Sequence, residues 1–205
     1  MYEFELAFHN QGYDLVAGLD EAGRGPIAGP VTAAAVILNP ADSIAGLNDS
    51  KQLSAKERER LAREIQARAL AYAVVFIDEA TIDAINIYQA AKRAMLEAVQ
   101  RLAVRPNALL TDAMPLPETH LPFLSLIKGD CRSASIAAAS ILAKVERDRH
   151  MLRMDSLYPG YGFSRHKGYL TKEHQTAIQS LGPSPIHRKT FSPIKELYQQ
   201  QLQLF

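Results

Sequence analysis

The stretch Leu15-Val16-Ala17-Gly18-Leu19-Asp20-Glu21-Ala22-Gly23-Arg24-Gly25-Pro26 says more about the fold than any other part of the chain. Its apolar half is a short run bounded by glycine, which predicts a buried strand over residues 15–20. Asp20 and Glu21 end that strand, where two carboxylates are costly to desolvate unless a cation compensates. The glycines that follow leave backbone amides bare, so that a phosphodiester can come close. Paired acids beside such a turn predict a divalent-metal site next to a phosphate, as in a nuclease or a phosphotransferase.

Length and composition set the broad class of the protein. The chain has 205 residues, which suits one domain, and 47% hydrophobic with 22% charged residues is normal for a soluble globular protein. No apolar stretch approaches the roughly 20 residues that span a bilayer, and the first residues lack the order of a signal peptide. The single cysteine, Cys131, excludes a disulfide framework. The spacing of His166, His174 and His187 does not indicate a zinc site. We therefore expect a cytoplasmic protein with no membrane association.

Charge is unevenly distributed along the chain, although the formal net charge is only +1. Residues 1–143 carry 13 basic and 17 acidic side chains, whereas residues 144–195 carry 10 basic and 4 acidic ones. An acidic part that can hold metal, followed by a basic segment with interleaved Tyr and His, fits a polyanionic partner. A basic segment is also typical of ordinary solvated surface, so the charge pattern alone leaves both interpretations open.

Strand and helix patterns alternate along the chain, which predicts an α/β fold with a helical C-terminal extension. The run over residues 31–38 is close enough to the first strand to pair with it as a hairpin. Ser54 followed by Glu57 is a capping-box pattern that begins an amphipathic helix reaching about residue 70. Further strands are expected over residues 72–77, 108–111 and 123–127. Further helices are expected over residues 88–102 and 133–154, from Thr171 to Gly182, and after Ser192-Pro193.

Acidic side chains end three of the expected strands: Asp20 and Glu21 the first, Asp112 the fourth, and Asp130 the fifth. Strand ends of an α/β sheet can converge on one crevice, where ligands commonly bind. Carboxylates that meet there raise one another's pKa, and divalent cations resolve that conflict. Mg²⁺ prefers carboxylate and water oxygens. Two such ions about 3.5–4 Å apart activate a water and stabilise the leaving oxygen of a displacement. A lone aspartate after a strand is more often a turn former, but each of these acids follows an apolar run.

Two neighbours of these acids need separate interpretation. Asp148 competes with Asp130 for the fourth acidic position, but it lies between Arg147 and Arg149 on the long expected helix, where ion pairing is a simpler explanation. Cys131 follows Asp130 directly, and no histidine or base motif nearby would make it a nucleophile. We therefore expect Asp130 to belong to the site and Cys131 to be a packing residue.

Five blocks of sequence keep a recognisable order from about Asp14 to Lys195. They are Asp20–Pro26, Asn48–Ser54, Lys128–Asp130, Ala138–Val145, and Tyr161–Phe163 with His166–Tyr169. Together they resemble bacterial ribonuclease HII, a type 2 ribonuclease H. The resemblance implies a ribonuclease-H-like fold with a central mixed β-sheet flanked by helices and a helical C-terminal extension. On this basis residues 1–155 form the catalytic core, and residues 156–205 form a substrate-binding loop and helical extension of the same domain.

The resemblance also implies an activity. The family hydrolyses the RNA strand of RNA–DNA hybrids and cuts on the 5′ side of a single ribonucleotide embedded in duplex DNA, leaving 3′-hydroxyl and 5′-phosphate ends. Asp20, Glu21, Asp112 and Asp130 match its four catalytic, metal-binding carboxylates by position, with Mn²⁺ or Mg²⁺ as the cofactor. Water would be the nucleophile. The alternatives are another nuclease of similar fold, such as a junction resolvase, and a non-catalytic module that binds hybrids.

Discrimination between RNA and DNA depends on the 2′-hydroxyl, which both donates and accepts hydrogen bonds. The resemblance implies that Gly23, Arg24 and Gly25 read this hydroxyl through main-chain groups, and that Tyr169 packs against the neighbouring deoxyribose. It implies that Lys51 contacts a phosphate near the scissile bond. Taken alone, the glycines would simply make the hairpin turn, Tyr169 would be a surface aromatic residue, and Lys51 would belong to a polar loop.

The last third of the chain supplies two further expectations. Basic side chains there should contact the duplex backbone, which positions the substrate without reading its sequence and weakens with salt; they are Arg165, Lys167, Arg188 and Lys189. The tail Gln201-Leu202-Gln203-Leu204-Phe205 resembles the short peptide with which bacterial replication and repair proteins dock onto the sliding clamp. The alternative for the tail is a frayed helix end with an apolar stripe. We expect a monomer.

Overall fold

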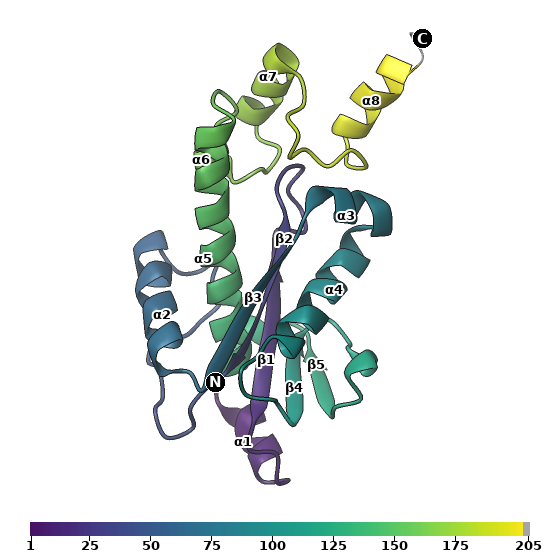
Figure 1. Ribbon diagram of the computed structural model, residues 1–205. Coiled ribbons are helices and arrows are strands. Elements are labelled where there is room, and N and C mark those ends of the chain that lie inside the picture. Colours follow the sequence, from purple (N-terminus) through teal and green to yellow (C-terminus); the bar gives the residue numbers. More distant parts are fainter. Residues whose placement is uncertain (203–205) are drawn as a thin grey trace.

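The computed structural model describes the backbone of residues 1–202 and the side chains of residues 1–199. Its centre is a five-stranded mixed sheet in the order β3-β2-β1-β4-β5 (Figure 1). The strands span Val16–Ala22 (β1), Val31–Ile37 (β2), Ala71–Ile77 (β3), Ala108–Asp112 (β4) and Phe123–Leu126 (β5). β1, β2 and β3 pair as antiparallel neighbours, whereas β4 runs parallel to both β1 and β5. The predicted α/β class and its mixed sheet are confirmed.

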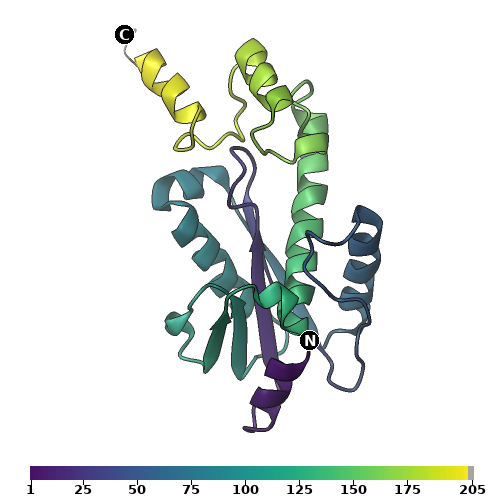
Figure 2. The same cartoon turned by 180° about the vertical axis from the view of Figure 1, so that it is seen from behind.

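Helices cover both faces of this sheet (Figures 1 and 2). They span Glu3–His9 (α1), Ala55–Arg68 (α2), Glu79–Ile85 (α3), Ile87–Gln100 (α4), Ala134–Leu157 (α5), Phe163–His166 (α6), Lys172–Leu181 (α7) and Ile194–Leu202 (α8), with 3₁₀ turns at Pro117–Thr119 (η1) and Gly129–Cys131 (η2). On one face, Leu19 of β1 belongs to the same apolar core as Met95 of α4. On the other face, Val36 of β2 packs in a core with Leu61 of α2 and Ile141 of α5. In the described residues, no helix is long and apolar enough to cross a membrane.

The local signals in the sequence identify several helix starts correctly. Ser54 and Glu57 form the capping box in front of α2, because each side chain bonds the backbone N–H of the other. Thr171 accepts a hydrogen bond from the backbone N–H of His174 at the start of α7. The sequence did not predict α1 or α3, each of which has seven residues. Two turns of helix are too short to establish a clear hydrophobic period.

β1 is longer than predicted, which corrects the placement of the first two acids. The strand was expected to end at Asp20 but continues to Ala22, so both acids lie inside it and pair with residues of β2. On its other side, β1 pairs with β4 only as far as Leu19, which lies opposite Thr111. The acids therefore belong to a strand that has a partner on one edge only, and the second edge is open next to them.

The C-terminal part lies beyond the turn that joins β1 to β2 (Figures 1 and 2). Backbone bonds fasten it to the loop of residues 23–30: the N–H of Ile27 donates to Gly168 O at 2.9 Å, and the N–H of Gly29 donates to Ile186 O at 2.9 Å. α5 ends at Leu157, close to the boundary expected after residue 155. The side chains of the tail Gln201–Phe205 lie outside the described residues, so the structure does not address the clamp motif.

Three histidines gather in the core of this C-terminal part, although their spacing had not indicated a common site. The rings of His166 and His174 stack with centroids 4.2 Å apart, and His174 Nε2 lies 3.0 Å from His187 Nε2. The outer nitrogens bond the backbone, His174 Nδ1 to Tyr169 O and His187 Nδ1 to the N–H of Ser184. Burial lowers the pKa of His174 and of His187 to about 4. Both rings are therefore neutral at pH 7 and join α7 to the segment that follows it.

Candidate active site

Three of the four predicted acids meet beside the open edge of β1. Leu19 lies opposite Thr111 in the parallel register, so the next residues, Asp20 and Asp112, are neighbours that point to the same face of the sheet. Asp130 arrives from η2, where the backbone N–H of Gly129 donates to Asp112 Oδ1 at 2.7 Å. One carboxylate oxygen from each aspartate lies within 4.8 Å of the other two. Asp112 and Asp130, which follow Asp20 by 92 and 110 positions in the sequence, thus form one cluster with it.

Gly18 allows α5 to cover this cluster closely. It points to the same face of β1 as Asp20, and a Cβ atom built on it would lie 2.1 Å from the carbonyl carbon of Ser135 in the first turn of α5. Only glycine permits that approach. Further along α5, Ser140 Oγ lies 2.9 Å from Ser50 Oγ, which joins the helix to the loop that carries Lys51. The helix therefore shields Asp20 from water and at the same time positions the loop opposite it.

The electrostatics of the cluster favour a bound cation. Burial raises the pKa of Asp20 well above its usual value, and the neighbouring charge of Glu21 raises it further. Burial also raises the pKa of Asp130, and the charges of Asp49 and Asp112 add to that effect. Oxygen-only donors of this kind suit a hard divalent cation such as Mg²⁺ or Mn²⁺. A cation between the carboxylates would let all of them stay ionised at neutral pH.

Glu21 follows Asp20 directly but lies outside the group of three aspartates. Its Oε1 accepts a hydrogen bond from Arg24 Nη1 at 3.0 Å. Its Oε2 is buried and has no hydrogen-bond partner among the described residues. A buried carboxylate oxygen without a donor costs free energy, so this orphaned atom is the second sign that the site suits a metal ion. The acids present therefore fit the cofactor that the sequence predicted.

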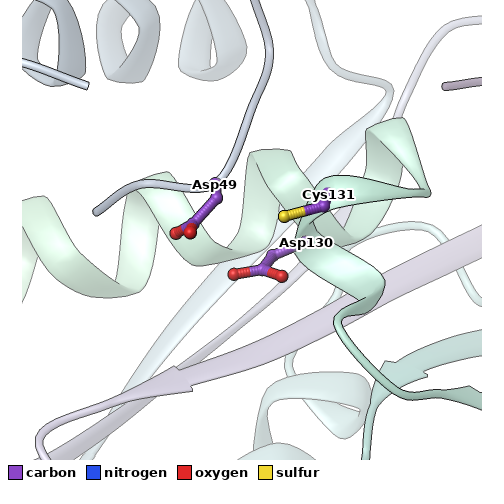
Figure 3. Close-up of side chains that lie close together, drawn as sticks. All are labelled: Asp49, Asp130 and Cys131. Atoms are coloured by element: carbon purple, nitrogen blue, oxygen red, sulfur yellow. The ribbon is translucent and has the colours of Figure 1, made fainter. Parts of the chain in front are cut away.

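Asp49 was missed by the sequence-based prediction, and Cys131 was interpreted wrongly. Asp49, Asp130 and Cys131 form a second group whose potential ligand atoms lie within 4.8 Å of one another (Figure 3). Asp49 had been seen only as part of the block around Lys51, where nothing marks it as a neighbour of Asp130. Cys131 was expected to be a packing residue, but its side chain is exposed. The short turn η2 explains the error, because it buries Asp130 and leaves the next residue at the surface.

Asp148, the alternative to Asp130, lies elsewhere on α5. Its Oδ1 accepts a hydrogen bond from Lys144 Nζ at 2.7 Å, one helical turn away. The expected ion pair therefore exists, although its partner is Lys144 rather than either adjacent arginine. Arg149 instead pairs with Glu59 and Glu146. The acidic cluster therefore contains Asp130 and not Asp148.

A cleft of about 450 Å³ contains most of the other predicted site residues. The turn from Gly23 to Gly25 forms one wall, and Lys51 and Tyr169 also line the cleft. Gly23 has a φ of +95°, which an L side chain rarely adopts, and Tyr169 is 47% exposed with its ring 3.5 Å from where a Cβ of Gly25 would lie. Partial burial opposes the charge of Lys51, but the carboxylates around it, Asp49 and Asp130 first, raise its pKa overall. The structure therefore places the ammonium group of Lys51, the ring of Tyr169 and the glycine turn beside Asp20 and Glu21.

Arg188 was expected to contact a nucleic-acid backbone, and this prediction is wrong. The residue is 0% exposed, and its guanidinium donates to Gly23 O at 2.6 Å, Arg24 O at 3.1 Å and Gly29 O at 2.9 Å. Its position in a basic run, His187-Arg188-Lys189, is typical of a surface segment and concealed this role. By contrast, Arg165 is exposed and its guanidinium pairs with Glu173, so its contact with a nucleic-acid backbone stays a prediction.

A mixed sheet of this order, with acids gathered on β1, at the end of β4 and just after β5, defines the ribonuclease-H-like class of metal-dependent nucleases. The comparison with family models agrees, because the model of ribonuclease HII matches residues 17–194. The chain belongs to the ribonuclease HII family. It is 55% identical over 197 residues to a ribonuclease HII from Enterococcus faecalis, covering 96% of this chain and 77% of the relative. It is 52% identical over 200 residues to one from Bacillus cereus, with coverages of 98% and 77%.

Solved structures give the same result. The ribonuclease H2 from Pyrococcus horikoshii is similar with a TM-score of 0.77 at 25% identity, covering 90% of this chain and 97% of that one. The RNase HII in a PCNA complex from Archaeoglobus fulgidus is similar with a TM-score of 0.76 at 29% identity, with coverages of 87% and 95%. The chain is therefore a nuclease that hydrolyses phosphodiester bonds by ribonuclease H chemistry.

Proposed function

We propose that this nuclease hydrolyses the RNA strand of RNA–DNA hybrids and also cuts on the 5′ side of a single ribonucleotide embedded in duplex DNA. The products would carry 3′-hydroxyl and 5′-phosphate ends. The observation that supports this most directly is that Asp20 of the aspartate cluster lines one cleft together with the turn of residues 23–25. Hydrolytic groups and a turn with bare amides then lie where a single ribose and its phosphate can contact both.

Asp20, Asp112 and Asp130 are the residues that would hold the divalent cations, with Glu21 supplying its unpaired oxygen. When bound, Mg²⁺ or Mn²⁺ supplies activation of the attacking water and stabilisation of the charge that develops on the phosphate. The protein's own contribution is to hold these carboxylates at fixed positions under α5, where a bound cation would keep them ionised. No side chain is required as a covalent nucleophile, and the exposed Cys131 has a pKa raised by desolvation and by the charge of Asp130, which disfavours its thiolate.

The remaining residues of the cleft would bind and orient the substrate. Lys51 faces the acids from the loop before α2 and would contact a phosphate next to the scissile bond. The amides of Gly23, Arg24 and Gly25 would read the 2′-hydroxyl, and Tyr169 would pack on the sugar that follows. Because a flat exposed ring suits an unsubstituted deoxyribose, this pair would favour an RNA-to-DNA junction.

The decisive experiment is cleavage of a labelled DNA duplex that contains one ribonucleotide, with the cut mapped at nucleotide resolution. We expect one cut on the 5′ side of the ribonucleotide in Mn²⁺ or Mg²⁺ and no cut after chelation with EDTA. An all-DNA duplex of the same sequence should stay intact. Cutting of the all-DNA duplex would favour a nuclease of the junction-resolvase type. Binding without cutting in either metal would favour a non-catalytic hybrid-binding module.

We further propose that the protein acts in the cytoplasm as a monomer and that its tail, Gln201–Phe205, docks onto a sliding clamp. Leu and Phe side chains on a short terminal peptide are suited to an apolar groove. Deletion of the last five residues should abolish clamp binding in a pull-down while leaving cleavage of the free duplex unchanged. Clamp binding that survives the deletion would remove the motif from consideration.

A further inference from the structure

Among the residues whose side chains the structure describes, two arginines are buried without a carboxylate in ion-pair distance. Arg188 is 0% exposed and Arg147 is 1% exposed, and each donates three hydrogen bonds to backbone carbonyls, five of which lie in the loop of residues 23–30. Burying a guanidinium is costly in free energy. The cost is tolerated only where hydrogen bonds satisfy its fixed set of N–H donors. The two residues bind different carbonyls. Arg188 donates to those of Gly23, Arg24 and Gly29, whereas Arg147 donates to those of Ala28, Pro30 and Lys167.

The bonds of Arg188 fix the orientation of two successive peptide planes. Gly23 O belongs to the same peptide as the N–H of Arg24, and Arg24 O belongs to the same peptide as the N–H of Gly25. Both peptides are trans, so each N–H points away from its carbonyl and hence away from Arg188. Neither of these two N–H groups donates to another protein group within the described residues. Arg24 and Gly25 both line the cleft.

We propose that Arg188 is the positioning residue for ribose discrimination: by holding the carbonyls of Gly23 and Arg24, it aims the N–H groups of Arg24 and Gly25 at the 2′-hydroxyl. This inference rests on the proposed function, in which the turn reads that hydroxyl. Arg188 itself never touches the substrate. Its position 165 residues along the chain from Gly23 means that the C-terminal part of the protein sets the specificity of a turn near its N-terminus.

Arg188→Lys tests this inference, with Arg147→Lys as the matched control. Lysine keeps the charge but concentrates its donors at one point, so it cannot hold three separated carbonyls. Arg147 is equally buried, and all of its hydrogen bonds go outside the peptides of residues 23–25. It also packs beneath Gly23, whose added Cβ would lie 2.1 Å from Arg147 Nε. Lysine retains a methylene at that place, so the packing survives in the control.

The measurement is fluorescence anisotropy in Ca²⁺, which replaces the catalytic ions so that the duplex is bound rather than cut. Two duplexes of identical sequence are compared, one all-DNA and one with a single ribonucleotide. In the native protein the ribonucleotide should tighten binding. In Arg188→Lys we expect this preference to fall by about tenfold, with all-DNA affinity unchanged, because the N–H groups of Arg24 and Gly25 are no longer held toward the 2′-hydroxyl. Arg147→Lys should keep the preference, whatever it costs in stability.

The outcomes separate the inference from the function on which it rests. A native protein that does not prefer the ribonucleotide duplex would overturn the reading of the 2′-hydroxyl, and the inference with it. A preference that survives in Arg188→Lys, or that is lost equally in Arg147→Lys, would overturn the role of Arg188 alone. If Arg188→Lys does not fold, Asp83→Asn decides instead. Asp83 accepts bonds from the N–H groups of Lys189 and Thr190 and so anchors the segment that carries Arg188. A weakened preference would support the inference, and an unchanged one would refute it.

Discussion

Asp130 and Asp148 carry the same carboxylate in opposite surroundings. Asp130 is 5% exposed and shares its space with Asp20 and Asp112, whereas Asp148 is neutralised by Lys144 one turn away on α5. A carboxylate that must stay charged among other acids is useful only if a cation joins it. An aspartate with its own lysine needs no further partner.

The substitution of Asp130 by asparagine should therefore affect turnover far more than the same change at Asp148. We expect Asp130→Asn to lower kcat on a single-ribonucleotide duplex by about 100-fold or more, since an acid that we propose as a metal ligand is lost. Asp148→Asn should stay within about threefold of the native rate, because it removes only the part-buried ion pair with Lys144 on α5. Circular dichroism would establish that both variants fold. The opposite ranking of the two rates would assign the fourth acid to Asp148.

Individual residues were predictable where two separate features of the sequence identify them. Asp20, Asp112 and Asp130 each follow an apolar run and also match a family position, and the structure brings all three together. Arg188 and Asp49 are not identified by two such features. Their roles depend on contacts across 165 and about 80 residues, and a buried arginine bonded to carbonyls looks the same in a sequence as one on the surface. The catalytic role of each acid stays a prediction until the variants are measured.

At the scale of elements, the close packing of α5 on β1 is the contact that the site depends on. A Cβ at Gly18 would overlap the backbone of Ser135, and backbone atoms cannot move aside as a side chain can. Gly25, also beside the cleft, is different, because its added Cβ would meet only the Tyr169 ring at 3.5 Å. The two glycines therefore separate helix packing from the shape of the turn.

Gly18→Ala should destabilise the protein by about 2–4 kcal/mol, because α5 must shift away from the sheet to accept the methyl group. Gly25→Ala should change the free energy of unfolding by less than about 1 kcal/mol, since its new contact is an ordinary van der Waals distance. Urea unfolding followed by circular dichroism measures both. Equal stability of the two variants would mean that α5 can move without cost.

The longer elements followed from sequence patterns, whereas the short ones did not. The hairpin of β1 and β2 and the capped helices α2 and α7 rest on local signals, and the structure has them where expected. The extension of β1 past Asp20 could not be foreseen, because charged residues at a strand end look like the start of a turn. Pairing with β2 keeps these two residues in the strand. The division of the chain after residue 155 stays a prediction.

For the molecule as a whole, the buried histidines make stability depend on pH. The pKa of His174 and of His187 in the folded protein is about 4, against about 6.5 for an ordinary histidine. Between these values the unfolded chain binds more protons than the folded one, so the free energy of unfolding decreases as the pH falls. The cost reaches on the order of 3 kcal/mol for each ring that must take up a proton.

Urea unfolding at pH 7, 6, 5 and 4.5 should therefore show a steady loss of stability in the native protein. His187→Gln removes one of the two rings, and the same loss should be smaller. His120→Gln serves as the control, because that histidine is exposed and lies away from this cluster. A native protein and a His187→Gln variant with parallel pH profiles would contradict the assignment of the effect to these rings.

The hydrogen bonds between the loop of residues 23–30 and residues 168–188 have a consequence for the order of folding. They join groups up to 165 positions apart, while the hairpin and the helices close over far shorter spans. Contacts between distant parts of a chain require the largest loop closures and tend to form late. On refolding from denaturant, circular dichroism should thus recover before the ability to cut, and a freshly collapsed molecule would be shaped like a nuclease before it is selective.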